Sequence, residues 1–367
     1  MIETKTKYTY NDVCIVPAEV SSIRHRSQCN VFYEDEMLPL FTAPMNTVVD
    51  ETNFRLFKRN NIHPILPRTS NIKLRLKLSN EFWCAFSLSE FEQYFVKCED
   101  EENILDYGEK HYVLIDIANG HMRDLLLLIK AAKEKLVDNI TIMAGNIANP
   151  ETYNDLSEAG ADYVRIGIGG GHGCLTTSNT GIHYPMISLI DACRTAKNRY
   201  NCKAKIIADG GIRGYSDIIK ALAAGADYVM CGSIFNKMLE SSGETRILEI
   251  TEKYQPFIHA TNNDIVNQYE DETRKNFDSG ICKYKKQFYG MSTKIAQKIM
   301  GCDSLKTSEG LERIQPVEYT MDGWIENFID YLRSAMSYTG HTSLRGFTSG
   351  RVLLTVMSNN TYHSVNK

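Results

Sequence analysis

A cysteine that ends a glycine-rich segment is the residue of this sequence best placed for covalent chemistry. Five glycines stand among residues 167–173, Cys174 follows directly, and Thr176 lies two residues further on. Glycine lets backbone amides and carbonyls approach a ligand or an ion without hindrance from a Cβ atom. A thiol among exposed amides is a candidate nucleophile, because such dipoles stabilise the thiolate. The alternative is a buried structural role, which we expect for the other nine cysteines.

Two further segments combine glycine with polar side chains and suit a phosphorylated, hydroxyl-bearing ligand. Asp209 precedes Gly210 and Gly211, so its carboxylate can accept hydrogen bonds from ligand hydroxyls while the following amides face an anion. Gly232 and Ser233 follow the next apolar run and offer another amide and a hydroxyl. Two adjacent strand ends of this kind form the phosphate site common in α/β barrels. Either segment alone is equally consistent with an ordinary turn.

Other segments give weaker signals. The turn Tyr289–Ser292 could hold a flat heterocycle through its backbone, and Glu309 places a carboxylate before a glycine. Asp116 and Asn146 each follow an apolar run and are either cofactor contacts or caps of the next helix. The sequence contains neither the GxGxxG fingerprint nor a Walker loop. Any dinucleotide is therefore expected to bind without the Rossmann fingerprint.

The elements that must position these residues alternate regularly between about residues 111 and 235. Amphipathic segments such as 122–136 and 184–199 are predicted helices, and short apolar runs rich in β-branched residues separate them. This alternation is typical of a parallel sheet covered on both faces, in an open doubly wound sheet or in a closed barrel. The predicted strands are 112–118, 140–144, 163–168, 205–208 and 228–231, with earlier candidates at 39–45 and 63–66.

An internal repeat favours the closed barrel. The hexapeptide AGADYV occurs at residues 159–164 and again at 224–229, each time ending a predicted helix and entering a predicted strand. The candidate site residues follow successive strands, and those positions share one face in a (β/α)8 barrel. We therefore expect one α/β domain over residues 1–367, a (β/α)8 TIM barrel. Residues 241–288 break the rhythm without a clear strand and are predicted to form an inserted flap.

Composition excludes several classes of protein. The chain has 367 residues, of which 43% are hydrophobic, and its 41 basic and 45 acidic residues are interspersed. This composition excludes a disordered chain and gives no basic stripe for nucleic acid. No secretory signal or apolar span of membrane length is visible, and no CxxC pair occurs. We expect a cytoplasmic protein with reduced thiols that binds neither nucleic acid nor membrane.

Taken together, these motifs resemble the IMP dehydrogenase/GMP reductase family from about Tyr10 to Thr355. Each motif is short, but their joint order is highly specific. The resemblance implies a (β/α)8 barrel and a homotetramer. The matching segments are Asn11–Val13 with Val16–Pro17, Ala43–Met45 with Thr47–Val48, Asp116–Gly120, Ala144–Asn146, the glycine loop with Cys174, Ala208–Gly211, Tyr289–Ser292 and Ser308–Gly310.

Within this family, two absences favour reduction of GMP over oxidation of IMP. Only about 45 residues separate Arg68 from His111, with no room for the regulatory modules usual in the dehydrogenases. The stretch between Ser292 and Glu309 also lacks the Arg-Tyr pair that activates the hydrolytic water in those enzymes. The resemblance thus implies NADPH-dependent reductive deamination of GMP to IMP and ammonia through a covalent thioimidate on cysteine.

The resemblance also implies roles for individual residues. The nucleophile would be Cys174, and Thr176 and Glu309 would transfer protons to the departing ammonia. A potassium ion would bind the carbonyls of Gly169, Gly171 and Cys174. The substrate GMP would contact Asp209, Gly210, Gly211, Gly232, Ser233, Tyr289, Gly290, Met291, Ser292, Ser308 and Gly310. The cofactor NADPH would contact Arg26, Arg68, Asp116, Ile117, Ala118, Asn146 and Gly169.

The chain departs from the family pattern around the cysteine. The residues before Cys174 include His172 where the family has a phosphate-contacting serine, Thr177 replaces an arginine, and Arg68 follows a proline instead of a histidine. Three alternatives accompany GMP reduction, and the substitutions around Cys174 motivate the second of them. They are an IMP dehydrogenase without regulatory modules, a catalytically weak purine-nucleotide-binding regulator and a flavin-dependent barrel oxidoreductase.

Overall fold

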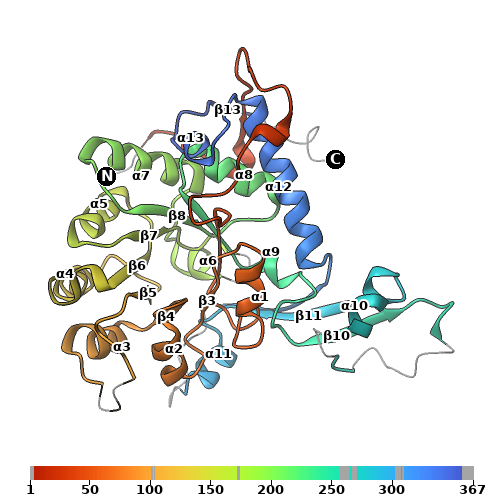
Figure 1. Cartoon of the computed structure of the whole chain (residues 1–367), viewed down its shortest axis with the longest axis horizontal. Coiled ribbons are helices and arrows are strands. Elements are labelled where there is room, and N and C mark those ends of the chain that lie inside the picture. The colour runs from red at the N-terminus through yellow and green to blue at the C-terminus, as the bar shows by residue number, and fades with distance from the viewer. Residues whose placement is uncertain are drawn as a thin grey trace.

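The apolar runs of the sequence form one eight-stranded parallel sheet. The computed structural model describes residues 4–357 except 101, 103, 172–173, 256–263, 267–270, 302–306 and 308–309. The strands lie in the order β2-β9-β8-β7-β6-β5-β4-β3, with helices around them (Figure 1). They are β2 (Leu40–Thr42), β3 (Ile65–Leu66), β4 (Trp83–Phe86), β5 (His111–Asp116), β6 (Ile140–Ile147), β7 (Tyr163–Ile166), β8 (Lys205–Asp209) and β9 (Tyr228–Cys231).

The sheet closes on itself between its first and last strands. Phe41 in β2 forms a parallel bridge with His63, which lies just before β3. The Thr42 amide donates to the His63 carbonyl and the His63 amide donates to the Leu40 carbonyl, both at 3.0 Å. The predicted (β/α)8 barrel is therefore confirmed, and the open doubly wound sheet is wrong.

Side chains alternate between the inside and the outside of the barrel, as the two-residue period of a strand requires. Phe41, Leu114, Met143 and Ile207 belong to the cluster of buried residues inside the barrel. Their strand neighbours, such as Val113, belong to the larger cluster formed with the helices. Because both faces are covered, the strands read as nearly continuous apolar runs.

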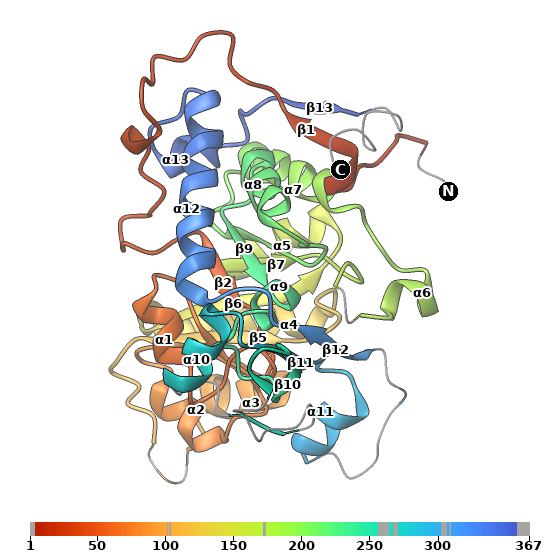
Figure 2. The same ribbon diagram turned by 90° about the vertical axis from the view of Figure 1, so that its right-hand side faces the viewer.

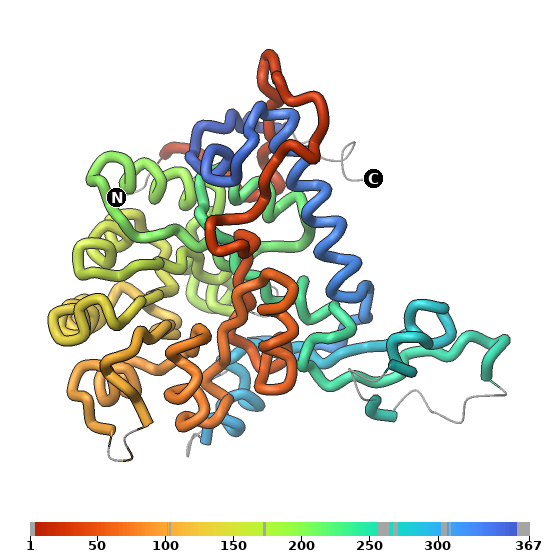
Figure 3. Tube along the Cα trace, viewed as in Figure 1, coloured from red at the N-terminus to blue at the C-terminus, as the bar shows by residue number. Residues whose placement is uncertain are grey.

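Helices follow the strands and cover the outside of the barrel (Figure 3). The repeated hexapeptide behaves as predicted, because Gly160 and Gly225 end α5 and α8 with φ of +106° and +113° and lead into β7 and β9. No helix among the described residues is both long enough and apolar enough to cross a membrane. The longer helices are α1 (Phe54–Arg59), α2 (Ile72–Leu78), α4 (Arg123–Leu136), α5 (Pro150–Ala159), α7 (Met186–Tyr200), α8 (Tyr215–Ala224), α10 (Asp271–Asp278), α11 (Lys294–Ile299) and α12 (Met321–Tyr338), and the shorter ones are α3 (Leu88–Phe91), α6 (Thr176–Thr180), α9 (Ser233–Asn236) and α13 (Leu344–Phe347).

The segment after β9 contains strands that the sequence analysis missed. A three-stranded antiparallel sheet joins β10 (Thr245–Ile250), β11 (Cys282–Tyr289) and β12 (Glu312–Pro316). With α10 it projects to the right of the barrel in Figure 1. The prediction of no clear strand in 241–288 was wrong because lysines occupy several positions of β11 and obscure the period of two. Buried residues nevertheless alternate along most of that strand.

The two ends of the described chain also meet. Strand β1 (Val13–Ile15) pairs antiparallel with β13 (Leu354–Val356), and the two lie side by side in Figure 2. The final segment therefore packs against the N-terminal segment through backbone hydrogen bonds.

A buried lysine in β11 should make the free energy of unfolding depend on pH. The Lys286 side chain is fully buried and its Nζ donates to the Ser241 carbonyl at 2.5 Å. Burial lowers the pKa of Lys286 well below its usual value. Between that lowered pKa and about pH 10.4, the unfolded chain therefore binds a proton that the folded chain does not. The free energy of unfolding should rise with pH over this interval.

We expect Lys286→Met to remove this rise in urea titrations at pH 7 and pH 9. The control is Lys285→Met, which changes a partly exposed lysine of the same strand. An unchanged pH dependence in Lys286→Met would contradict the prediction.

Candidate active site

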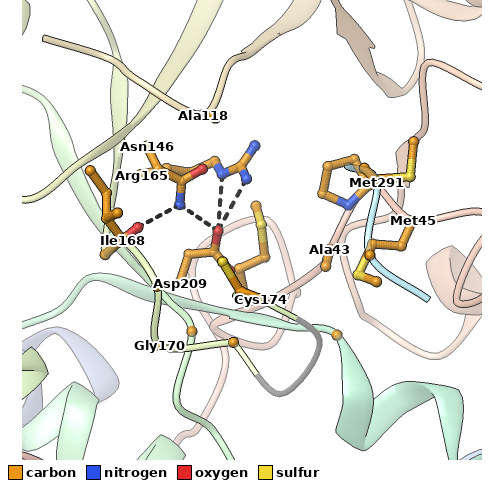
Figure 4. Close-up of a pocket in the computed structure, with 18 of the residues that line it drawn as sticks. Ala43, Met45, Ala118, Asn146, Arg165, Ile168, Gly170, Cys174, Asp209 and Met291 are labelled. Atoms are coloured by element: carbon orange, nitrogen blue, oxygen red, sulfur yellow. Dashed lines mark hydrogen bonds and ion pairs between the residues drawn. The ribbon is translucent and has the colours of Figure 1, made fainter. Parts of the chain in front are cut away.

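The carboxyl-terminal ends of the barrel strands surround a pocket of about 310 Å³. Its lining comes from segments far apart in the sequence, because parallel strands of a barrel end on one face. In Figure 4, Asn146, Arg165 and Asp209 lie on one side of the pocket and Ala43, Met45 and Met291 lie on the other. The predicted site residues that line it are Arg68, Asp116, Ile117, Ala118, Asn146, Gly169, Gly171, Cys174, Thr176, Asp209, Gly210, Gly211, Gly232, Ser233, Gly290, Met291 and Ser292.

Cys174 lies in the wall of this pocket and is half-buried, not buried in the hydrophobic core. Its Sγ lies 3.2 Å from the Thr176 hydroxyl oxygen, and its amide donates to the Gly171 carbonyl at 3.1 Å. Cys174 also forms an antiparallel bridge with Gly310. The neighbouring predictions Ser308 and Glu309, like His172, lie outside the described residues. The pocket thus presents a thiol with a hydroxyl beside it.

Glycine allows the cysteine loop to approach the loop that follows β8. A Cβ atom on Gly210 would lie 3.3 Å from the Gly171 amide nitrogen, and the φ of +106° at Gly210 disfavours any other residue. A Cβ atom on Gly167 would lie only 2.1 Å from the Asp209 carbonyl oxygen. Both loops therefore expose bare backbone to the pocket, as a ligand that binds through amide groups requires.

A buried ion-pair network forms the polar side of the pocket. Arg165 in β7 donates through Nη1 to Asp116 Oδ1 at 2.8 Å and through Nη2 to Asp209 Oδ2 at 3.1 Å. Asn146 also donates to Asp209 Oδ2, at 2.7 Å, and Arg68 Nε donates to Asp116 Oδ2 at 3.1 Å. Arg165 is only 6% exposed, so its guanidinium fixes both carboxylates in a region of low dielectric.

The charges of this network stabilise each other against burial. Burial alone raises the pKa of the Asp116 carboxyl, but Arg165 and Arg68 outweigh it and hold that pKa below its usual value. Burial alone would lower the pKa of Arg165, but Asp209 and Asp116 raise it. Asp116 is therefore an ionised carboxylate whose two oxygens both accept from arginine, which argues against a role as a simple helix cap.

Three of the described residues that were predicted for the site do not line the pocket: Arg26, Tyr289 and Gly310, the last of which is bridged to Cys174. Tyr289 faces away from it, and its hydroxyl accepts from Asn46 Nδ2 at 2.7 Å, whereas Phe288 lines the pocket. Adjacent residues of β11 point to opposite faces, so a shift of one residue exchanges them. Arg26 pairs with Asp330 of α12 at 2.8 Å on the surface and does not line the pocket.

Arg165 was not predicted as a site residue from the sequence. A charged residue in the middle of an apolar strand is a usable signal, because such a residue is rarely buried without a partner. The partner carboxylates belong to strands 49 and 44 residues away, and this pairing is not visible in the sequence. Phe288 carried no comparable signal.

These features define a (β/α)8 barrel with a thiol-bearing pocket at the carboxyl ends of its strands. The model of the "IMP dehydrogenase / GMP reductase domain" matches residues 97–364, which is most of the chain. The chain therefore belongs to the IMP dehydrogenase/GMP reductase family.

The chain is similar to proteins named for either of the two activities of this family. A GMP reductase of Staphylococcus saprophyticus is 29% identical over 328 residues, which cover 86% of this chain and 95% of the relative. A GMP reductase of Vibrio vulnificus is 27% identical and covers 97% of this chain and 96% of the relative. An inosine-5'-monophosphate dehydrogenase of Chlorobaculum parvum is 34% identical over 228 residues, which cover 62% of this chain and 42% of the relative.

Proposed function

We propose that this protein reduces GMP to IMP with release of ammonia, using NADPH as the hydride donor. The observation that carries the proposal is the half-buried Cys174 thiol in the wall of the barrel pocket, 3.2 Å from the Thr176 hydroxyl. Relatives named GMP reductase match this chain over nearly their full length. This supports GMP as the substrate.

The proposed reaction has two steps, both at carbon C2 of the purine. The Cys174 thiolate attacks C2, the C2–amino bond breaks, and ammonia leaves after proton transfer assisted by Thr176 and Glu309. The covalent thioimidate then accepts a hydride at C2, the C–S bond breaks, and IMP is released with the thiolate restored. Sulfur suits both steps, because a thiolate is a good nucleophile and also a good leaving group.

The remaining pocket residues would hold the nucleotide. The Asp209 Oδ2 atom accepts from Asn146 and Arg165, so we assign Oδ1 to the ribose hydroxyls. The backbone amides of Gly211 and Gly232 with the Ser233 hydroxyl would bind the phosphate. The turn of Gly290, Met291 and Ser292 would lie against the base, with Met45 on the same side of the pocket.

The described residues fit a nicotinamide cofactor beside the nucleotide. NADPH would supply a hydride to the carbon bound to sulfur. Arg68 uses only Nε toward Asp116. Within the described part of the chain its two terminal nitrogens have no hydrogen-bond acceptor, so they suit a cofactor phosphate. Ile117, Ala118 and Gly169 offer backbone beside the pair Asp116 and Asn146. We further propose a potassium ion on the carbonyls of Gly169, Gly171 and Cys174, and a homotetrameric assembly.

The experiment that tests the function compares the two directions of the family chemistry. We expect purified protein with GMP and NADPH to lose absorbance at the nicotinamide band and to release IMP and ammonia in equal amounts. Protein with IMP and NAD⁺ should give no comparable gain in absorbance. A gain with IMP and no loss with GMP would instead establish the dehydrogenase. Nucleotide binding without turnover in either direction would establish the regulator.

A further inference from the structure

A fully buried asparagine joins three segments that line the active-site pocket. Asn236 is the last residue of α9, the helical turn that begins with the pocket residue Ser233, and it has no exposed surface. Its backbone amide donates to the carbonyl of Gly232, another pocket residue, at 3.0 Å. Asn236 does not line the pocket itself. Any effect that it has on a bound nucleotide must therefore pass through the segments that it holds.

The side-chain amide of Asn236 bonds to the other two segments. Its Nδ2 atom donates to the Gln287 carbonyl at 3.0 Å and to the Thr47 carbonyl at 2.5 Å. Gln287 directly precedes Phe288, and Thr47 follows Met45 by two positions; Phe288 and Met45 both line the pocket. Both hydrogens of the amide group are thus used, and each of them holds the backbone beside a residue of the pocket wall.

Two neighbours complete this arrangement. Nε2 of Gln315 in β12 donates to Asn236 Oδ1 and also to the Ser233 carbonyl, the latter at 3.2 Å. Gly243 leaves the necessary space, because a Cβ atom there would lie 2.7 Å from Asn236 Nδ2. A buried amide whose oxygen and two hydrogens are all paired holds its partners rigidly. We call Asn236 with its partners Thr47, Gln287 and Gln315 the carboxamide junction.

The segments that meet at the carboxamide junction are those assigned to opposite ends of the nucleotide. Under the proposed function, Gly232 and Ser233 bind the phosphate, and Phe288 leads into the turn 290–292 that lies against the base. The distance between these two subsites decides where carbon C2 lies relative to the Cys174 sulfur. A displacement of about 1 Å between reacting atoms can lower a rate by about 100-fold.

We propose that Asn236 is a positioning residue that sets the spacing of the phosphate and base subsites and thereby places C2 of GMP against the Cys174 sulfur, an inference that rests on the proposed function. Asn236 acts through the backbone of Gly232, Gln287 and Thr47. Loss of its side-chain amide therefore leaves every group of the two subsites present and changes only their relative position. The rate of the reaction at C2 should fall more than the affinity for GMP.

The test replaces Asn236 by leucine, which has a similar volume but no hydrogen-bonding group. Calorimetry with GMP gives Kd and the number of binding sites, and assays at saturating GMP and NADPH give turnover per binding site. Unfolded protein is thereby left out of the rate. We expect turnover per site to fall about 10- to 100-fold, with a much smaller change in Kd. Wild-type turnover per site in Asn236→Leu, or a loss confined to Kd, would overturn the proposal.

The matched control is Asn53→Leu. Asn53 is also fully buried, and its Nδ2 atom also donates to two carbonyls, those of Val48 and Glu240. Neither Val48 nor Glu240 adjoins a residue that lines the pocket. We expect this variant to lose stability but to keep wild-type turnover per site. An equal loss of turnover per site in both variants would show a general structural role for Asn236 and refute its positioning role.

A second variant changes the carboxamide junction without removing the amide. Gly243→Ala places a methyl group against Asn236 Nδ2 and the Gln287 carbonyl, so it should also lower turnover per site. Gly214→Ala is its control, because a Cβ atom there meets nothing within 4 Å, and it should retain wild-type turnover. If Asn236→Leu does not fold, wild-type turnover per site in Gly243→Ala is sufficient to reject the proposal.

A further measurement does not depend on catalysis. Hydrogen exchange of the nucleotide-free protein, followed by mass spectrometry, should be faster in residues 287–292 of Asn236→Leu than in the wild type, and unchanged there in Asn53→Leu. Unchanged exchange in Asn236→Leu would contradict the positioning role. Faster exchange in a protein that does not reduce GMP would refute the proposed function, while Asn236 would still be the residue that positions this wall of the pocket.

Discussion

Replacing Cys174 by alanine should lower the turnover of GMP by at least about 10⁴-fold, the scale on which removal of a catalytic nucleophile acts. The reason is that no other described side chain lining the pocket offers a thiol to carbon C2. The affinity for GMP, measured by calorimetry without cofactor, should change little, because ribose and phosphate contacts remain. Steady-state kinetics and binding on the same preparation check both statements.

The matched control is Cys98→Ala, which also removes a half-buried thiol but lies outside the pocket. It should keep wild-type turnover. Mass spectrometry of protein quenched with GMP should show a covalent adduct in this control and none in Cys174→Ala. Turnover retained by Cys174→Ala within tenfold of wild type would rule out the covalent mechanism.

Replacing Arg165 by methionine should destabilise the protein by about 3–5 kcal/mol, because it leaves two carboxylates buried without their shared partner. Arg165→Lys should cost less, since lysine keeps the charge but cannot bridge Asp116 and Asp209 with a planar fork. Urea denaturation measures both free energies. GMP binding should weaken as well, because Asp209 loses two of the hydrogen bonds that orient it.

The pH dependence distinguishes this explanation from a loss of packing. In the wild type, Arg165 and Arg68 hold the pKa of Asp116 below its usual value despite burial. A depressed carboxyl pKa stabilises the folded protein above the unfolded value of about 3.9, and this contribution is lost as pH falls through the folded pKa. The deficit of Arg165→Met should therefore be largest near pH 7 and shrink towards pH 3. A deficit independent of pH would indicate packing alone.

Arg194 provides a comparison for the same substitution elsewhere. It forms a buried pair with Asp227 at 2.9 Å, and neither residue lines the active-site pocket. We expect Arg194→Met to lower stability without changing the affinity for GMP. Equal losses of GMP affinity in the two variants would contradict a specific role for Arg165 at Asp209.

Local sequence was sufficient for the parts of the fold that depend on neighbouring residues. The period of the apolar runs predicted β5 to β9, and the repeated hexapeptide predicted the glycine-terminated helices α5 and α8. It was insufficient where charge hides the period, as in β11, and for β4 (Trp83–Phe86), whose short apolar run we did not identify as a strand. Backbone preference and burial act over a few residues, so these elements can be recognised without the rest of the chain.

The sequence by itself determined which residues could do chemistry here. The thiol of the cysteine, the unhindered backbone of the glycine loops and the carboxylate of the Asp-Gly-Gly segment are properties of the residues themselves. The tertiary structure alone decided which groups lie next to these residues. It joined Arg165 to two carboxylates from different strands and placed Phe288 at the pocket instead of Tyr289. The pairing of β2 with β9 places residues 189 positions apart side by side, such as Leu40 and Val229, and the register of each strand selects the face that a side chain occupies.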